Sequence, residues 1–189
     1  MFDGVQNPTY ESLRAGFRWG IPEQFNIGTA CSDLQDRGAL ALIEVHEGRG
    51  REYTFGELAD YSSRLANGLR GLGVERGDRV AIMLPQGLRC GAAHLAVYKL
   101  GAVAVPLTQL FGPQALRYRL EDSHARVVIT DVTTQDVVAE VAGELGDISV
   151  VTAGGHAIPP HRDLDELVRE ASSTLSPVPT GPDDPAILI

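Results

Sequence analysis

The sequence has little of several features that mark specialised proteins. It contains two cysteines, Cys31 and Cys90, which is too few for a disulfide framework and is typical of a reducing compartment. No apolar run approaches the roughly 20 residues that cross a bilayer. The first residues lack the basic and apolar stretches of a secretory signal. We therefore expect a cytoplasmic chain with free thiols.

Positive charge is also scarce. The 16 lysines and arginines are outnumbered by 25 aspartates and glutamates, which gives a formal net charge of −9. Nucleic acids and anionic membrane surfaces are bound by clustered Lys and Arg, so both are disfavoured as partners. The 43% hydrophobic and 22% charged fractions are those of an ordinary folded protein, and 189 residues suffice for a domain with its own core.

Residues 1–35 show few periodic signals. Trp19 and residues 25–27 stand near Pro22 and several glycines, which favours an extended N-terminal arm whose aromatic side chains dock on another surface. A short helix is expected at 31–37.

A β-hairpin and a helix are predicted next. Residues 40–45 and 51–55 have the composition of strands and are separated by a turn at 47–50. Thr54 is followed three residues later by Glu57, which is the spacing of a capping box at a helix N-terminus. Beyond it, apolar side chains recur at spacings of three and four and predict a buried stripe: Leu58, Tyr61, Leu65, Leu69 and Leu72.

Strands and helices then alternate along the chain. The expected strands are 79–84, 102–106, 126–130 and 148–151, and the expected helices are 86–100, one opening at Gly112 and Pro113, 136–145 and 163–171. This alternation is typical of a parallel sheet with right-handed crossovers. We predict an α/β fold, with an open, mostly parallel sheet of about four strands that is flanked by helices and joined by the hairpin.

The C-terminal stretch has a different composition. Residues 172–184 are rich in Ser, Pro and Thr, as linkers are, and 186–189 are apolar like the start of a strand. We divide the chain into an arm (1–35), an α/β subdomain (36–171), and a Pro-rich linker with the start of the next strand (172–189). Such an ending leads us to expect truncation; an edge strand at a true C-terminus is the alternative.

The motifs supply no complete active site. Turns after the predicted strands carry no glycine-rich nucleotide fingerprint. The five histidines lack metal-ligand spacing, and His94 is expected to be a hydrogen-bonded core residue. Asp163, Asp165 and Glu166 open a predicted helix, where acidic residues offset the helix dipole. We predict no catalytic, cofactor-binding or metal-binding residue in this chain.

Several segments occur in a fixed order along the chain. They are YTFGEL at 53–58, GVERGDRVAIMLP at 73–85, HLAVYKLGAVAVPL at 94–107, LFGP at 110–113, YRLED at 118–122 and RVVITD at 126–131. In order and spacing they resemble the N-terminal part of the AMP-forming adenylating enzymes, which include acyl-CoA synthetases, adenylation domains of peptide synthetases and luciferases. Trp19 and residues 25–27 are similar to the arm of acetyl and medium-chain acyl-CoA synthetases. The resemblance covers nearly the whole chain.

The resemblance implies an acid–CoA ligase and the N-terminal subdomain of the adenylate-forming fold. In that family a carboxylic acid and ATP give an acyl-adenylate and pyrophosphate, and CoA then displaces AMP to form a thioester. ATP, Mg²⁺ and CoA are implied for the full-length parent enzyme. None is expected to bind this chain alone, because the family's phosphate loop, magnesium ligands and C-terminal lysine would lie past Ile189. The chain by itself is expected to be inactive.

One candidate site follows from the resemblance. It is the loop formed by Thr108, Gln109, Leu110, Phe111 and Gly112, which follows a predicted strand. Open α/β sheets bind ligands at the carboxyl ends of their strands. By analogy with the family, the loop lies near the channel for the acid and for the pantetheine of CoA. A packed connector is the alternative interpretation, and residues 132–136 lack the arginines that meet CoA phosphates in some relatives.

Two classes of function stay open. The first is the N-terminal portion of an AMP-forming acyl-CoA synthetase, which acts in fatty acid metabolism. The second is a truncated, non-catalytic paralogue that self-associates or pairs with a full-length synthetase through the apolar edge at 186–189. Exposed apolar faces would give the isolated chain modest stability and favour self-association. The absent glycine fingerprint excludes a nucleotide-dependent oxidoreductase.

Overall fold

The computed structural model describes residues 9–46, 48–155 and 157–189. Residues 1–8 of the expected arm, Glu47 of the expected turn and His156 lie outside the described residues. The helices are α1 (Tyr10–Gly16), α2 (Ile27–Ala30), α3 (Phe55–Gly71), α4 (Leu88–Lys99), α5 (Pro113–Ser123), α6 (Gln135–Leu145) and α7 (Leu164–Glu170). The strands are β1 (Leu40–His46), β2 (Arg49–Thr54), β3 (Arg79–Ile82), β4 (Val103–Pro106), β5 (Ala125–Asp131), β6 (Ser149–Ala153) and β7 (Arg162–Asp163).

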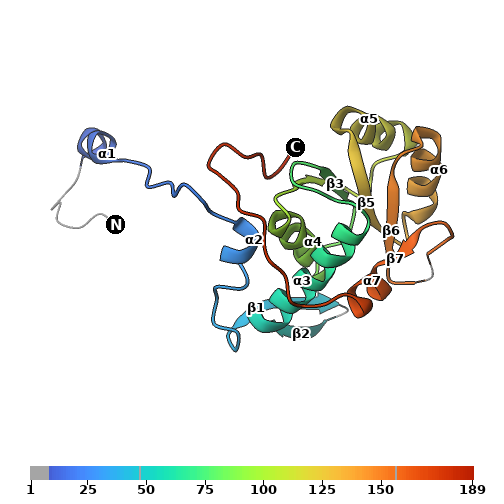
Figure 1. Ribbon diagram of the computed structural model, residues 1–189, viewed down its shortest axis with the longest axis horizontal. Helices are drawn as coiled ribbons and strands as arrows, with labels where there is room; N and C mark the ends of the chain where they lie inside the picture. Colours follow the sequence, from blue (N-terminus) through green and yellow to red (C-terminus); the bar gives the residue numbers. More distant parts are fainter. Residues whose placement is uncertain (1–8, 47, 156) are drawn as a thin grey trace.

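The main sheet is parallel, with the strand order β4-β3-β5-β6-β7 in the described part of the chain. Successive side chains of a strand point to opposite faces, so each strand contributes side chains to the hydrophobic core on either face of the sheet. Helices α3, α4 and α7 cover one face of the sheet, and α5 and α6 cover the other (Figure 1). Val80 belongs to the core on the first face and Ala81 to the core on the second. The predicted α/β fold is confirmed. The expectation of about four strands is exceeded by β7, whose two residues are too short for a sequence signal.

The hairpin is a separate sheet. β1 and β2 pair antiparallel, and the pair packs against α3. Tyr53 of β2 is 5% exposed, and its hydroxyl donates a hydrogen bond to Glu44 at 3.0 Å. The prediction that the hairpin joins the parallel sheet is therefore wrong. Part of the outer edge of β4 is instead paired with the C-terminal residues around Ile187.

The capping box and the apolar stripe of α3 are confirmed. The Glu57 backbone donates to the Thr54 hydroxyl at 3.2 Å, and the Thr54 backbone donates to the Glu57 carboxylate at 2.8 Å. Two orphan donors at the helix start are thus satisfied reciprocally. Leu58, Leu65 and Leu69 are buried, while Tyr61 and Leu72 pack at the core margin.

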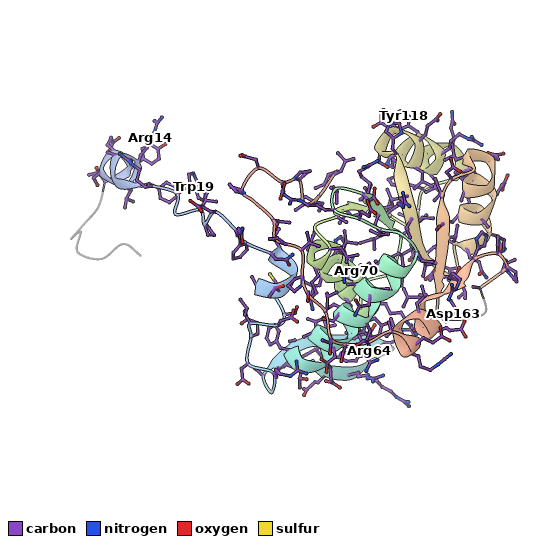
Figure 2. All side chains as sticks on the ribbon, in the orientation of Figure 1. Arg14, Trp19, Arg64, Arg70, Tyr118 and Asp163 are labelled. Carbon is purple, nitrogen blue, oxygen red and sulfur yellow. The ribbon has the colours of Figure 1, made fainter. Side chains whose placement is uncertain are left out.

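The N-terminal arm contains two short helices that the sequence did not predict. Figure 1 shows α1 standing well away from the sheet, joined to α2 by an extended segment. Trp19 on this segment (Figure 2) is 79% exposed, and its ring packs edge-on against the ring of Phe17. Docking of the Trp19 ring on another surface stays a prediction. The helix expected at 31–37 is wrong. The helix in this region is α2, which begins after its cap Asn26 and ends at Ala30, and residues 31–35 form turns and a bend.

The C-terminal residues lie along α3 and α4 rather than away from them. Backbone hydrogen bonds join Val178 to Lys99 and Leu188 to Ala104. Residues 172–184, which have the composition of a linker, are therefore held against the domain. No helix among the described residues is both long enough and apolar enough to span a membrane.

Candidate functional site

The strand order creates a switch point at the carboxyl edge of the sheet. After β3 the chain moves to β4 on one side and then crosses to β5 on the other. Helices that leave in opposite directions open a crevice at such a point, and ligands of open α/β sheets bind there. A cavity of about 230 Å³ lies here, lined by residues 84–87 after β3, 131–132 after β5 and 153–154 around the end of β6, with Glu44 and Arg89.

The predicted loop at 108–112 reaches this edge. It leaves β4, and the Gln109 amide donates to the Asp131 carboxylate at 3.0 Å and to the Thr133 hydroxyl at 3.2 Å. The Thr108 hydroxyl accepts from the Leu110 backbone at 3.3 Å. Because Asp131 ends β5, the loop crosses the end of β3, which lies between β4 and β5. Two chain segments 22 residues apart are thus fixed together at the switch point.

Asp131 is the centre of this network. Besides Gln109, its carboxylate accepts from the Thr133 backbone at 3.0 Å and from the hydroxyls of Thr133 and Thr134 at 2.6 and 3.3 Å. Partial burial alone would raise the pKa of Asp131, but the hydrogen bonds from Thr133, Gln109 and Thr134 hold that pKa below its usual value. Asp131 is therefore an ionised structural acceptor and is not poised as a general acid.

The rest of the loop combines packing with exposure. The Phe111 ring packs against the core beneath the Arg119 guanidinium, which lies 3.9 Å from the ring centroid. Gly112 precedes Pro113 at the first turn of α5, a position that proline prefers. Leu110 is 91% exposed. The loop is thus a fixed support that presents one apolar side chain to solvent.

A second polar contact joins α4 to α7 near the same edge. Arg89 donates to both carboxylate oxygens of Asp165, at 3.0 and 2.9 Å. Asp163 caps α7 by accepting from the Glu166 backbone at 2.8 Å, as expected of an acidic residue at a helix start. Burial and the nearby Asp165 carboxylate raise the pKa of Tyr61 to about 12, so its phenol stays neutral.

Two further titratable groups, Cys90 and His94, lie on α4, and both are at least partly buried. Burial raises the pKa of the Cys90 thiol and lowers the pKa of His94, which keeps both groups neutral near pH 7. His94 Nδ1 lies 3.4 Å from the Tyr98 hydroxyl, in keeping with its predicted place as a hydrogen-bonded core residue. Within residues 9–46, 48–155 and 157–189, no three His, Cys, Asp or Glu side chains form a group that could hold a metal ion.

The sequence analysis missed the role of Asp131. A signal was present, because an aspartate directly after a strand and two residues before a threonine is typical of an Asx turn. Its link to Gln109 had no local signal, because the two residues meet only when β4 and β5 lie in one sheet.

Comparison with known proteins places the chain in a family. Residues 30–189 match the family described as AMP-binding enzyme. The chain belongs to this family. The chain is 33% identical over 142 residues to a 3-hydroxybenzoate–CoA ligase of Aromatoleum sp. (strain CIB), covering 75% of this chain and 27% of the relative. It is 29% identical to an acetyl-coenzyme A synthetase of Stutzerimonas stutzeri (strain A1501), covering all of this chain and 32% of the relative.

Solved structures agree with this assignment. The chain is similar to a Brucella canis acyl-CoA synthetase with a TM-score of 0.81 and 27% identity, over 93% of this chain and 34% of that one. It is also similar to a benzoate CoA ligase from Burkholderia xenovorans LB400, with a TM-score of 0.73 and 26% identity over 86% and 32% of the two chains. The resemblance predicted from the motifs is confirmed. The chain spans about a third of the length of these relatives.

Proposed function

We propose that this chain supplies the N-terminal portion of an AMP-forming acid–CoA ligase. In the proposed reaction a carboxylic acid and ATP form an acyl-adenylate and pyrophosphate, and CoA then displaces AMP to give acyl-CoA. The observation that carries the proposal is the match to CoA ligases and acetyl-CoA synthetases over nearly the whole chain. Free cysteines are in keeping with a cytoplasmic location.

The residues of this chain do not fit the ATP phosphates or Mg²⁺. No glycine-rich phosphate loop occurs in the sequence, and the described residues hold no group of three possible metal ligands. We therefore assign ATP and Mg²⁺ to the full-length parent and derive no step through them. The chain alone is proposed to be inactive, with a scaffolding role for the reaction.

We propose that the loop 108–112 lines the channel for the acid or for the pantetheine of CoA. Its exposed Leu110 offers an apolar wall, and the Gln109–Asp131 hydrogen bond holds that wall in place before a substrate arrives. The ionised Asp131 carboxylate repels phosphates, so the wall fits the neutral pantetheine arm better than the nucleotide end of CoA.

Activity assays test the main proposal. The 189-residue chain is incubated with ATP, Mg²⁺, CoA and C2–C12 acids while AMP and thioester are measured. We expect neither product, and robust turnover would contradict the proposal that the chain is inactive alone. A chimera in which this chain replaces the aligned third of the Stutzerimonas stutzeri synthetase is expected to make acyl-CoA.

The same chimera tests the loop. Leu110→Asp places a second carboxylate on the proposed channel wall and is expected to raise the KM for CoA about tenfold without changing the KM for ATP. Leu34→Asp is the matched control, because Leu34 is also exposed, at 74%, but lies outside the loop. Equal KM values for CoA in both variants would favour the packed-connector interpretation.

A second candidate function is an interaction module. Ile187 and Leu188 are 45% and 43% exposed beside Ala104 of β4, and an exposed edge of this kind can pair with a strand of another protein. Size-exclusion chromatography of this chain alone and with a full-length synthetase distinguishes the two functions. Stable co-elution without any activity in the chimera would favour the module.

A further inference from the structure

The C-terminal segment 172–185, here called the strap, is held through its main chain. Arg64, Asn67 and Arg70 lie three residues apart on α3, and their side chains donate to carbonyl oxygens of residues 171–176 at 2.5 to 3.2 Å. Figure 2 labels Arg64 and Arg70 along α3, where the strap passes over the helix. These contacts hold the first half of the strap.

The second half of the strap meets the N-terminal arm at Asn26 and Phe25. The Asn26 Nδ2 group donates to the carbonyls of Tyr98, at 2.8 Å, and Val178, at 2.9 Å. Its Oδ1 accepts from the Thr29 backbone at 3.0 Å and so caps α2. The Val178 backbone in turn donates to the Lys99 carbonyl at 2.8 Å. Asn26 therefore joins the arm, the C-terminal end of α4 and the strap.

Further hydrogen bonds continue this junction along the strap. The Phe25 backbone donates to the Thr180 carbonyl at 2.9 Å, and the Thr180 hydroxyl donates to the Phe25 carbonyl at 2.5 Å. Asp184 then accepts from the Gly181 backbone at 2.8 Å and from Arg76 at 2.5 Å.

The strap leads directly into residues 186–188, which form an isolated parallel bridge with Ala104 of β4. The Ala104 backbone donates to the Ala186 carbonyl, and the Leu188 backbone donates to the Ala104 carbonyl, each at 2.9 Å. These bonds place Ile187 beside Ala104. A one-residue slip of this extended segment would turn its side chains to the opposite face of the sheet.

Apolar packing contributes little where the arm and the strap face each other. A cavity of about 220 Å³ separates them, lined by apolar groups that include Ile21, Phe25, Tyr98, Pro182 and Pro185. An open cavity forfeits the dispersion contacts that close packing would supply. The hydrogen bonds of Asn26 and Phe25 are consequently the main attachment between the two segments.

We propose that Asn26 is a latch that makes the arm and the strap dock as one unit, and that this docking sets the register of residues 186–188 on β4. Loss of the Asn26 donor would remove the side-chain hydrogen bond to the Val178 carbonyl of the strap, while the Tyr98 carbonyl at the end of α4 would keep only the Gly101 backbone as its donor. The strap would then detach from α4 over the residues between Val178, which contacts Lys99, and Asp184, which contacts Arg76. The proposal does not depend on the proposed function.

Hydrogen exchange of the full chain, followed by NMR, tests the latch. Asn26→Asp keeps the oxygen that caps α2 but removes the amide donor. We expect exchange at the Val178 and Leu188 amides to accelerate at least tenfold, while the Thr29 amide and the core amide of Val128 keep their wild-type rates. Acceleration at Val178 with an unchanged rate at Leu188 would overturn the coupling between junction and strand.

Two further variants separate the latch from simpler explanations. Asn26→Ser also keeps a capping oxygen but adds no charge, so the same acceleration is expected; wild-type rates in this variant would overturn the assignment to the amide donor. Asn67→Asp removes donors to the first half of the strap only. We expect it to leave Leu188 at its wild-type rate, and acceleration there equal to that of Asn26→Asp would overturn a specific role for Asn26.

Discussion

The ammonium of Lys99 lies 2.7 Å from the carboxylate of Asp33, and this ion pair ties the arm to the core. The Lys99 side chain is 1% exposed, whereas the Asp33 side chain is 38% exposed. The ammonium also donates hydrogen bonds to the hydroxyls of Ser62 and Ser63, each at 2.9 Å, and to the Ala59 carbonyl at 3.2 Å. Burial lowers the pKa of Lys99, and the hydrogen bond and charge of Asp33 act in the opposite direction.

Asp33→Ala is expected to lower the free energy of unfolding by about 2 kcal/mol, because it leaves a buried ammonium without its counter-charge. The loss is smaller than for a fully buried pair, since water reaches Asp33. Urea denaturation measures it. Asp122→Ala on the exposed side of α5 is the control, with an expected change within about 0.5 kcal/mol.

The double variant Asp33→Ala with Lys99→Met is expected to be more stable than Asp33→Ala alone. Removing the buried charge removes its desolvation penalty, and methionine fills much of the same volume. Urea denaturation of both proteins provides the comparison. If the double variant were the less stable of the two, the hydroxyls of Ser62 and Ser63 would be the dominant partners of the ammonium.

Gly28→Ala is expected to detach α2 from α4. An added Cβ would lie 2.6 Å from the Leu95 carbonyl oxygen and 2.8 Å from the Lys99 backbone nitrogen, and neither backbone atom can move away cheaply. We expect a loss of about 2 kcal/mol in urea denaturation, as for other overpacked sites. Gly91→Ala on α4 is the control: a Cβ there meets nothing within 4 Å, so helix propensity should raise stability by about 0.5–1 kcal/mol. Equal changes in the free energy of unfolding for Gly28→Ala and Gly91→Ala would disprove the close approach of α2 to α4 at Gly28.

Asp131→Ala is expected to release the loop at 108–112. Its carboxylate accepts hydrogen bonds from Gln109, Thr133 and Thr134, and losing them should cost about 1–3 kcal/mol of stability. Hydrogen exchange at the Leu110 amide should accelerate more than exchange at core amides. Asp136→Ala, an exposed acidic residue in the first turn of α6, is the control. An unchanged rate at Leu110 in Asp131→Ala would show that packing of Phe111 alone holds the loop.

Stability is expected to fall as the pH drops below about 6.5 because of His94. Burial lowers the pKa of His94 in the folded chain, so the unfolded chain binds more protons between that lowered pKa and the ordinary value. The stabilisation from neutral His94 is therefore complete above the ordinary pKa of histidine. It is lost as the pH falls from that value toward the lowered pKa, and the free energy of unfolding decreases by no more than about 1.4 kcal/mol per pH unit. Urea denaturation from pH 7.5 to 5 should show a steeper decline for wild type than for His94→Gln. Parallel declines would exclude His94 as the source.

The pattern of helices and strands was largely predictable because its signals are local. The Thr54–Glu57 capping box and the apolar run before Pro85 depend on residues a few positions apart. α1 and α2 were missed because each is short, at seven and four residues, and carries no apolar period. The loop at 108–112 was located correctly at the end of β4, but its tie to Asp131 was not foreseen.

Spacing of apolar, capping and turn residues along the chain was enough to determine the α/β alternation, because its signals are local. The resemblance to adenylating enzymes came from a series of family-like motifs in order along the sequence. Only the tertiary structure decided that the hairpin stands apart from the main sheet, that residues 172–185 form a strap, and that Asn26 and Lys99 join the arm to α4. The physical reason is the separation along the sequence of the residues that interact. These features depend on hydrogen bonds and charges between groups tens of residues apart, and such groups acquire partners only when the whole chain has folded.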